Sequence, residues 1–335
     1  MRKPLSHPSN IPLVRLNLIQ PFLLELQRRG IDAQPLLREF EISAETIMNP
    51  DVFVPSPIIY RLLQKFADSA SDPYLGLTQG EALDISQWSP LAEASRKAKT
   101  VYDLLLRCAG NARKDASSVE LTLHSDGERA EFQVHRFNEP SFQPSQADAF
   151  WIGILVSILK KATGEHWKPR EVIAFVCDSR ALPKNYEHVR ISEHDASGPK
   201  LKFPSEWLMA EFAMDQATTD SQLPKQTVAQ NFVDSLRQTL RPYIGDPQLN
   251  ADLAARLCDT SKRTLQLRLQ ICNTTIKYEI DELRRQQAVD DLQNSDLSIS
   301  SIAVRAGYKN AASFTRAFRK WTDLSPREYR QRNLQ

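Results

Sequence analysis

The side chains best suited to chemistry are arginines, glutamines and small polar residues on two short helical patterns in the last third of the chain. Arg263 and Gln266 stand about one helical turn apart, and Arg316 follows Ala311–Ser313 in a later pattern. Arginine pairs bidentately with guanine and glutamine with adenine, while small or methyl-bearing side chains meet the methyl group of thymine. These residue types are therefore chemically able to contact base edges in a major groove.

The later pattern occupies Leu297–Arg332 and predicts two short helices around a tight turn, followed by a third helix. Gly307 interrupts the pattern where a positive φ needs no strain, and Ser325 and Pro326 suit the start of the last helix. A short helix, a glycine turn and a basic amphipathic helix are typical of a helix-turn-helix. The apolar residues that share one face at helical spacing are Ile299, Ile302, Ala303, Phe314, Ala317, Phe318 and Trp321.

Residues 250–270 repeat this helix-turn-helix pattern. Leu253 corresponds to Ile302, and Asp259 occupies the turn where the other copy has Gly307. Aspartate tolerates the left-handed conformation better than most residues but less well than glycine, which predicts some strain. The helix predicted between the copies has about 19 residues and would span roughly 28 Å. Successive major-groove faces lie roughly 34 Å apart, so a rigid connector of this length can hold two recognition helices in adjacent grooves.

Composition and charge support a modular globular protein. The 335 residues are enough for two or three domains, and the hydrophobic fraction of 41% is that of a globular chain. The formal net charge of +2 conceals a basic excess after residue 226 and an acidic excess before it. This asymmetry suits a polyanion-binding module joined to a separate control domain.

The sequence shows no sign of metal binding or of a membrane span. The longest apolar run, Phe150–Leu159, is too short to cross a bilayer, and residues 1–10 lead into no signal-type apolar core. We therefore expect a cytoplasmic protein that carries no metal or cofactor and has no membrane association. The cysteines, which lack zinc-ligand spacing and fit a reducing compartment as free thiols, are Cys108, Cys177, Cys258 and Cys272.

The chain before residue 216 is predicted to mix helices and strands, and the chain after residue 225 to be wholly helical. Between them, the polar, proline-containing residues 216–225 indicate a linker. The predicted organisation is a leader at 1–10, an α+β domain at 11–215, the linker, and an all-α domain at 226–335. Predicted strands are 118–124, 129–137 and 171–177, with a hairpin turn at Ser125–Gly127 and a strand-to-helix edge at 201–209. Predicted helices are 13–29, 31–40, 55–71, two segments within 90–112, 145–162, 230–243, 250–257, 261–269 and 275–293.

Residues 226–332 resemble the DNA-binding domain of AraC/XylS-family transcription regulators. Residues 13–215 are similar, over shorter motifs at Leu26–Gly30 and Asp72–Leu77, to the arabinose-binding-type sensor domain that precedes this module in some family members. The resemblance implies two helix-turn-helix motifs joined by a long helix, behind an effector-sensing and dimerisation domain. The motifs that carry it are S-x-R-T-L-Q at Ser261–Gln266, I-A-x-R-x-G-Y at Ile302–Tyr308, S-F-x-R-x-F-R-K at Ser313–Lys320 and L-S-P-x-x-Y-R at Leu324–Arg330.

By motif position, the resemblance implies that helices 261–269 and 311–321 read bases. Leu267 replaces an arginine frequent in the family, and two alanines in the second copy offer no hydrogen bonds, so specificity there rests on Arg316, Thr315 and DNA shape. The residues assigned to base edges are Arg263, Gln266, Leu267, Ala311, Ala312, Ser313, Thr315 and Arg316. Those assigned to phosphate contacts, with a solvated basic face as the alternative, are Lys262, Arg268, Lys309, Arg319 and Lys320.

The residues that line an effector pocket are harder to predict from the sequence. Arg136 follows the apolar face of the predicted strand 129–137, where an inward charge would await an anionic ligand. His135, Trp88 and Trp151 are the other candidates to line the pocket. Each has an ordinary alternative, because strand residues divide between core and surface and helix-borne tryptophans usually pack.

The sequence thus predicts a non-enzymatic, sequence-specific transcription regulator. It would bind double-stranded DNA on the nucleoid, work with RNA polymerase and form a homodimer. A small-molecule effector of unknown identity would bias two arrangements of the DNA-binding domain. Two alternatives stay open: control by a partner protein instead of a ligand, and a DNA-repair alkyl-transfer protein with the same module. The second needs a zinc-activated cysteine cluster, against which the scattered cysteines argue.

Overall fold

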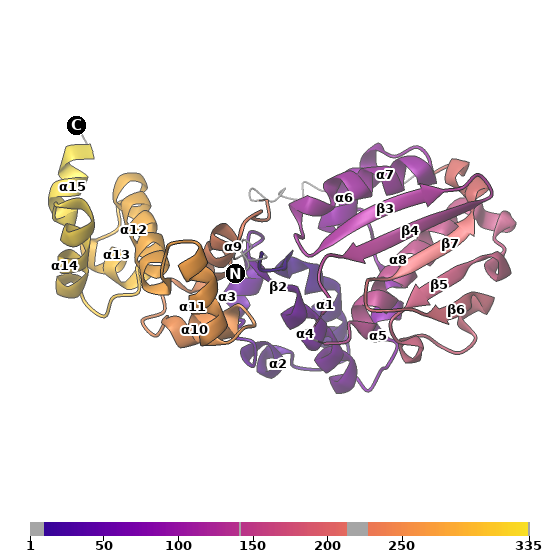
Figure 1. Ribbon diagram of the computed structural model, residues 1–335, viewed down its shortest axis with the longest axis horizontal. Coiled ribbons are helices and arrows are strands. Elements are labelled where there is room, and N and C mark those ends of the chain that lie inside the picture. Colours follow the sequence, from indigo (N-terminus) through magenta and orange to yellow (C-terminus); the bar gives the residue numbers. More distant parts are fainter. Residues whose placement is uncertain (1–9, 141, 213–226, 334–335) are drawn as a thin grey trace, which may run out of the picture. The chain divides into compact units, whose positions relative to one another are not determined.

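The computed structural model describes residues 10–140, 142–212 and 227–333, which form two compact units (Figure 1). The mixed unit comprises the described residues between Pro12 and Val228, and the helical unit joins residues 10–11 to the described chain from Ala229 onward. The predicted linker and residues 1–9 of the predicted leader lie outside the described residues. The predicted boundaries remain predictions, although Ile11 packs in the helical unit, where its N–H donates to Ser235 Oγ at 3.3 Å.

A five-stranded sheet with the order β3-β4-β7-β5-β6 organises the mixed unit. Strands β5 and β6 run parallel, and the other neighbouring pairs are antiparallel. The hairpin between β3 and β4 turns at Gly127, whose φ is +99°, as its sequence predicts. The short β6 was not predicted, because its residues carry no clear alternation of apolar and polar side chains. The strands are β3 (Val119–Ser125), β4 (Arg129–Arg136), β5 (Ile173–Val176), β6 (Arg190–Glu193) and β7 (Lys200–Pro204).

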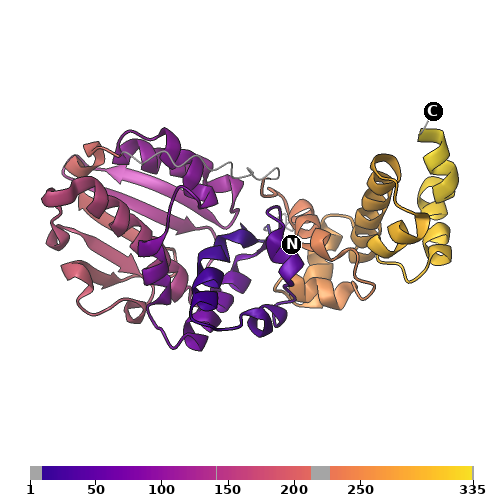
Figure 2. The same ribbon diagram turned by 180° about the vertical axis from the view of Figure 1, so that it is seen from behind.

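Helix α8 crosses one face of this sheet, and α7 lies beside β3 (Figures 1 and 2). Helices α5 and α8 pack with their backbones in close approach, which glycine permits: a Cβ on Gly80 would lie 2.1 Å from the Phe150 carbonyl oxygen. A Cβ on Gly153 would lie 2.4 Å from that of Leu77. The helices of the unit are α1 (Gln20–Arg28), α2 (Gln34–Arg38), α3 (Ala44–Met48), α4 (Ser56–Ser69), α5 (Leu75–Ala82), α6 (Ser89–Lys97), α7 (Val101–Asn111) and α8 (Ser145–Thr163).

The helix predicted at 13–29 is wrong at its start. Strand β1 (Leu13–Arg15) pairs with β2 (Phe53–Pro55), a 3₁₀ helix follows at Leu16–Ile19, and α1 begins only at Gln20. The cause is non-local, because the buried Arg15 forms an ion pair with Asp115 at 2.6 Å. Periodicity along the chain carries no information about such a distant partner.

The helical unit consists of short helices arranged around the longer α12 (Figure 1). Polar N-caps start most of them, and the last helix begins with a capping box in which Ser325 and Glu328 bond reciprocally, at 2.7 and 3.3 Å. Its helices are α9 (Phe232–Leu240), α10 (Ala251–Leu257), α11 (Lys262–Ile271), α12 (Ile276–Asn294), α13 (Ile299–Arg305), α14 (Ala311–Thr322) and α15 (Pro326–Asn333). The predicted fold class, an α+β domain followed by an all-α domain with two helix-turn-helix motifs, is confirmed.

Candidate nucleic-acid interface and internal cavity

The first helix-turn-helix consists of α10, a tight turn and α11. Asp259 in the turn has a φ of +50°. The N–H groups of Asp259 and Thr260 donate to the carbonyls of Arg256 and Ala255, both at 3.0 Å, and so close the end of α10. The left-handed turn predicted at Asp259 is therefore present.

Helix α11 presents three of the predicted base-reading side chains on one surface. Arg263 and Gln266 are exposed, and Leu267 beside them is 50% exposed. Leu265 and Leu269, on the opposite side of the helix, are buried in the core of the unit. The amphipathic pattern thus separates packing residues from residues that are available to a partner.

Two residues assigned to phosphate contacts in this copy are already engaged. Lys262 forms an ion pair with Asp252, with Nζ and Oδ2 2.9 Å apart, and both side chains are exposed. Arg268 is half-buried, and its guanidinium carbon lies 5.8 Å from the ring centre of Phe232. Exposed ion pairs are weak, so Lys262 can exchange its carboxylate for a phosphate, whereas Arg268 also has a packing role.

The second helix-turn-helix consists of α13, a tight turn and α14. Gly307 has a φ of +76°, and the N–H of Tyr308 donates to the Ala303 carbonyl at 2.8 Å. A Cβ on Gly307 would lie 2.4 Å from the carbonyl oxygen of Ile244 and 2.8 Å from Nη2 of Arg284. This turn therefore needs glycine both for its backbone conformation and for the space that the neighbouring chain occupies.

The predicted base-reading surface of α14 has few free hydrogen-bonding groups. Arg316 is exposed, and its Nη2 donates to Ser313 Oγ at 3.2 Å. The Thr315 hydroxyl donates to the Ala311 carbonyl at 2.8 Å, so its proton is used within the helix. Ala312 is exposed, whereas Ala311, Ser313 and Thr315 are half-buried. The predicted phosphate partners Lys309, Arg319 and Lys320 are all exposed.

Aromatic side chains pack beneath this second copy. Phe314 and Phe318 are fully buried, with ring centres 5.6 Å apart. Trp321 and Tyr329 lie against Phe318 at 6.2 and 5.4 Å, and Tyr308 contacts Phe314 at 5.7 Å. Phe314 and Phe318, which the sequence places on the apolar face of this helix, therefore lie in the core of the helical unit.

The two copies are joined by a contact that sequence reasoning missed. Arg284 in α12 donates to the carbonyls of Ile244 and Asp246, at 3.4 and 3.1 Å, on the side of the first copy. Its guanidinium carbon lies 5.5 Å from the ring centre of Tyr308, in the turn of the second copy. An arginine in the middle of a long helix looks like a surface residue in sequence, so no local signal distinguishes it. Arg284 thus links the segment before the first copy to the turn of the second copy.

In the mixed unit, Arg136 points inward as predicted, but it does not await a ligand charge. It is 6% exposed and forms an ion pair with the buried Asp148. Its Nε also donates to the Tyr60 hydroxyl at 3.3 Å. Burial lowers the pKa of Arg136, but Asp148 and Tyr60 outweigh burial and raise the pKa above its usual value. The expectation of a free inward charge is therefore wrong, because α8, the helix that follows this strand along the chain, supplies its counter-ion.

His135 belongs to the opposite face of β4. The buried residues of this strand are Ala130, Phe132, Val134 and Arg136, and the half-buried His135 alternates with them. Its ring lies edge-on to Phe137, with ring centres 6.2 Å apart. The structure therefore does not place His135 with Arg136, since successive side chains of a strand point to opposite faces.

The other predicted pocket residues do come together, around a cavity of about 100 Å³ between the sheet and the helices of the mixed unit. Trp88, Trp151 and Arg136 all line it. The indole rings of Trp88 and Trp151 meet edge to face, with ring centres 5.7 Å apart. Most of the remaining wall is apolar, so the cavity is an internal, largely hydrophobic site.

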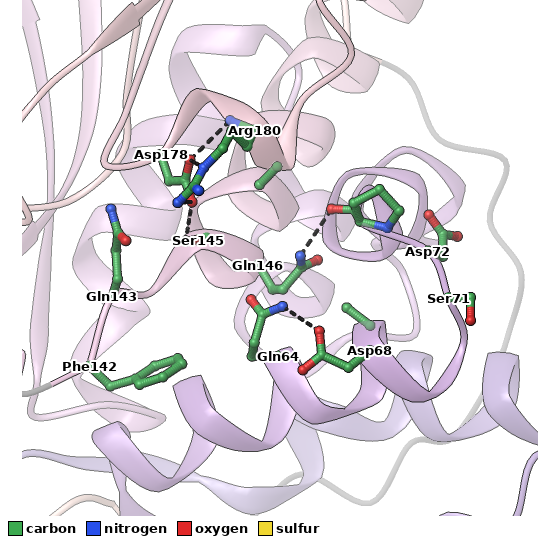
Figure 3. Close-up of a pocket in the computed structure, with 13 residues that line it drawn as sticks. Gln64, Asp68, Ser71, Asp72, Phe142, Gln143, Ser145, Gln146, Asp178 and Arg180 are labelled. Atoms are coloured by element: carbon green, nitrogen blue, oxygen red, sulfur yellow. Dashed lines mark hydrogen bonds and ion pairs between the residues drawn. The ribbon is translucent and has the colours of Figure 1, made fainter.

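A second, larger concavity of about 660 Å³ is an open polar groove between α4, α8 and the segment after β5 (Figure 3). Its polar groups largely satisfy one another. Asp178 pairs with Arg180 at 2.9 Å and accepts from Ser145 at 3.2 Å, while Gln64 donates to Asp68 at 2.9 Å. This groove offers a ligand few groups that are not already bonded.

Neither a metal site nor a membrane helix is found in the described part of the chain. No group of three or more His, Cys, Asp or Glu residues there is placed to hold a metal ion. No described helix is long and apolar enough to cross a bilayer. Burial raises the pKa of the Cys108 and Cys258 thiols to about 12, so neither thiol is activated as a nucleophile.

Comparisons with known proteins match both units. Residues 253–332 match the helix-turn-helix domain family. Residues 30–209, more than half of the chain, match the arabinose-binding domain found at the N-terminus of AraC transcription regulators. The order of the two matches along the chain is that of a sensor domain followed by a DNA-binding module.

Two curated relatives and one solved structure align with nearly the whole chain. The ornithine utilization regulator of Pseudomonas aeruginosa is 25% identical over 99% of each chain. The HTH-type transcriptional regulator VirS of Mycobacterium tuberculosis is 23% identical, over 95% of this chain and 96% of the relative. The crystal structure of transcriptional regulator CdpR from P. aeruginosa aligns with 98% of this chain and 100% of that chain, at 19% identity and a TM-score of 0.40. The chain belongs to the AraC family of transcription regulators, with a DNA-binding helix-turn-helix module behind an N-terminal sensor domain.

Proposed function

We propose that this regulator reads two adjacent major grooves on one side of the duplex, with α11 in one groove and α14 in the next. The observation that carries the proposal is the joint at Arg284, which bonds to the segment before α10 and packs on the turn before α14. The 19-residue helix α12 would span roughly 28 Å, close to the roughly 34 Å between successive major-groove faces. A connector of this length suits adjacent grooves and no wider spacing.

The proposed readout follows from the exposed side chains. Arg263 would pair with guanine and Gln266 with adenine, while Arg316 would provide the guanine contact of the second copy. The alanines of α14 and Leu267 would lie against thymine methyl groups. The full proposed set is Arg263, Gln266, Leu267, Ala311, Ala312, Ser313, Thr315 and Arg316, with Lys262, Arg268, Lys309, Arg319 and Lys320 on phosphates.

A spacing experiment tests the joint directly. Preferred binding sites are selected from random duplexes with the full chain, and footprinting locates the two DNA segments that the protein covers. Base pairs are then inserted between these two segments. A half-turn insertion rotates one segment to the far side, and a full-turn insertion restores the side but roughly doubles the distance. We expect both insertions to weaken binding at least about tenfold, since a rigid joint can satisfy only one spacing.

The matched variant is Arg284→Met, which keeps a long side chain but removes the bonds to Ile244 and Asp246. It should bind the selected site more weakly and tolerate the inserted spacings better than the native chain. Native affinity for the full-turn insertion in the unaltered protein would show that the two copies are flexibly tethered, and would exclude the proposed geometry.

The proposal extends to control by a small-molecule effector bound in the mixed unit. Its support is the internal cavity lined by Trp88, Trp151 and Arg136. An effector acts only if it binds two arrangements of the protein with different affinity. Homodimerisation, action with RNA polymerase at the promoter and a cytoplasmic location complete the proposed function, in which the chain is not an enzyme.

Cavity filling tests effector control. Target promoters are first mapped by genome-wide binding in the native host, and one of them is fused to a reporter. Ala147→Leu places extra side-chain volume in the cavity wall, and we expect it to preserve DNA binding but abolish the response of the reporter to growth conditions. A reporter that still responds with the cavity filled would point to control by another route.

That other route is a partner protein, and one feature favours it. Tyr102 and Leu106 lie one turn apart on α7 and are 46% and 50% exposed, so they form a small apolar surface. Tyr102→Ser combined with Leu106→Ser should then abolish regulation that survives cavity filling. The alkyl-transfer alternative gains no comparable support, because burial raises the pKa of Cys108, Cys177 and Cys258 alike.

A further inference from the structure

The walls of the internal cavity come from elements that are far apart in the sequence. Phe22 of α1, Ile59 of α4 and Phe150 of α8 supply the helical side, and Leu121 and Val134 supply the sheet side. All of these side chains are buried. The lining is therefore mainly hydrocarbon, and it favours an apolar occupant.

The charged groups at the cavity wall are already neutralised. Arg136 pairs with Asp148, which is itself buried. Asp115 pairs with Arg15 at 2.6 Å, and Arg15 is buried as well. An ionic ligand would have to break one of these pairs or enter without a counter-ion, and both are strongly unfavourable in an apolar surrounding. Charge thus excludes zwitterions, carboxylates and ammonium ions from this site.

One donor at the wall is unused. The indole nitrogen of Trp88 is buried and has no hydrogen-bond partner among the described residues, and Trp88 is 6% exposed. Phe150 and Trp151 hold its ring, with centres 5.4 and 5.7 Å away, so it cannot turn to solvent without repacking. Buried donors are normally satisfied, and an unsatisfied one requires an explanation. A bound acceptor would supply it.

We propose that the cavity binds a small, neutral, mainly apolar molecule whose carbonyl or ether oxygen accepts the Trp88 indole N–H. The inference rests on the proposed effector control for its biological role. The volume of about 100 Å³ is below the roughly 150 Å³ of a cavity that holds benzene, so the occupant is at most ring-sized unless the walls move. The buried residues Ser56 and Ser118, which also line the cavity, add hydroxyl groups but no charge.

Matched probes of equal size test the chemistry on the full chain. Cyclopentanone carries the acceptor, methylenecyclopentane replaces its oxygen by a CH₂ group, and cyclopentylammonium replaces it by a charge. Indole N–H resonances of the five tryptophans are followed by NMR with ¹⁵N labelling. We expect cyclopentanone to shift the Trp88 resonance and bind about fivefold more tightly than the hydrocarbon, and cyclopentylammonium to leave the resonance unchanged.

Two variants keep the result interpretable. Trp88→Phe preserves an aromatic ring but removes the donor, so it should bind the ketone and the hydrocarbon equally. Trp167→Phe is the matched control, because Trp167 packs on Trp207 with ring centres 5.2 Å apart and does not line the cavity. It should retain the preference for the ketone. Ala147→Leu, which narrows the cavity without touching the donor, should abolish binding of both probes.

The proposal is overturned if cyclopentylammonium shifts Trp88 at concentrations where cyclopentanone does not, or if the preference for the ketone survives in Trp88→Phe. DNA affinity measured with the same probes separates this inference from effector control. Ketone binding that leaves DNA affinity unchanged would remove the regulatory role but keep the site. A regulated promoter in a chain that binds neither neutral probe would remove the site but keep effector control.

Discussion

The two helix-turn-helix copies reach the same backbone turn by different means. Asp259 and Gly307 both adopt a positive φ, and equivalent backbone hydrogen bonds close the turns after them. Only at Gly307 does another part of the unit occupy the space of a Cβ, since the Ile244 carbonyl oxygen would lie 2.4 Å away. The turn itself thus requires a residue in the left-handed conformation. At Gly307, the contact with Ile244 also leaves no room for a side chain.

The largest expected effect comes from substitutions in the two turns. Gly307→Ala adds a Cβ against backbone and strains the left-handed residue, so we expect it to destabilise the helical unit by about 2–4 kcal/mol. Asp259→Ala adds no atom beside the backbone, since aspartate already carries a Cβ, and should cost less, about 1 kcal/mol. Hydrogen exchange in the full chain measures the difference, with the α13 and α14 amides followed in Gly307→Ala and the α10 and α11 amides in Asp259→Ala. Gly110→Ala, in α7 with nothing within 4 Å of its Cβ position, is the neutral control.

Equal protection of α13 and α14 in Gly307→Ala and native protein would mean that the turn before α14 can move away from Ile244. The rigid joint between the copies would then lose its main structural basis, and so would the spacing expected of the DNA site.

The copies also differ in the exposed side chains that the proposed readout assigns to bases. Helix α11 presents both Arg263 and Gln266, whereas α14 presents Arg316 beside alanines. Ser313 accepts from Arg316 at 3.2 Å, so the guanidinium is already ordered near the start of the helix. In the proposed readout, the second copy therefore relies on one polar side chain and the first copy on two.

Truncation of the two arginines should show this difference. We expect Arg316→Ala to reduce affinity for the selected site about 100-fold and Arg263→Ala about tenfold, since each bidentate guanine contact contributes about 1–3 kcal/mol and Gln266 remains in the first copy. Competition binding against a scrambled duplex measures both. Lys309→Ala is the control, because loss of a phosphate contact weakens specific and scrambled binding alike and lowers the salt dependence by about one ion. An equal loss for both arginines would show that Gln266 adds little to the first copy.

The sequence predicted the helical unit far better than the mixed unit, and the reason is the range of the interactions. The buried stripe of Phe314 and Phe318 and the positive φ of Gly307 are encoded within a few residues, so periodicity and turn chemistry reveal them. The pairing of β1 with β2 and the Arg136–Asp148 ion pair join separate segments. A single sequence carries no local trace of such partners.

The residues of the candidate sites also divide into those that local sequence predicts and those that depend on distant partners. Exposure of Arg263, Gln266 and Arg316 follows from helix periodicity, and the structure agrees with it. The role of Arg284 between the copies could not be predicted, because its bonds reach Ile244 and Asp246, in the turn before α10, which lie 40 and 38 residues away along the chain. In the mixed unit, strand alternation placed Arg136 inward, but it also assigns His135 to the other face, so these two residues cannot share one pocket.

A substitution that adds a base contact to the first copy also tests the difference between the copies. Leu267→Arg restores a guanidinium to the exposed surface of α11, and we expect it to raise preference for guanine at one position about five- to tenfold. Site selection with the variant and with Leu267→Met, which keeps an apolar side chain of similar volume, gives the measurement. An unchanged base preference in Leu267→Arg would place this side chain outside the groove.

The smallest expected effect concerns Thr315, whose two chemical groups can be separated. Its hydroxyl donates to the Ala311 carbonyl at 2.8 Å, so we expect the methyl group, and not the hydroxyl, to meet the base. Thr315→Val keeps the methyl group and should change specific affinity less than about twofold. Thr315→Ser loses it and should weaken sites with thymine at that position about fourfold, the value of one buried methyl group. The opposite ranking in binding titrations would mean that the hydroxyl leaves the helix backbone on binding, and that α14 carries a second polar reader beside Arg316.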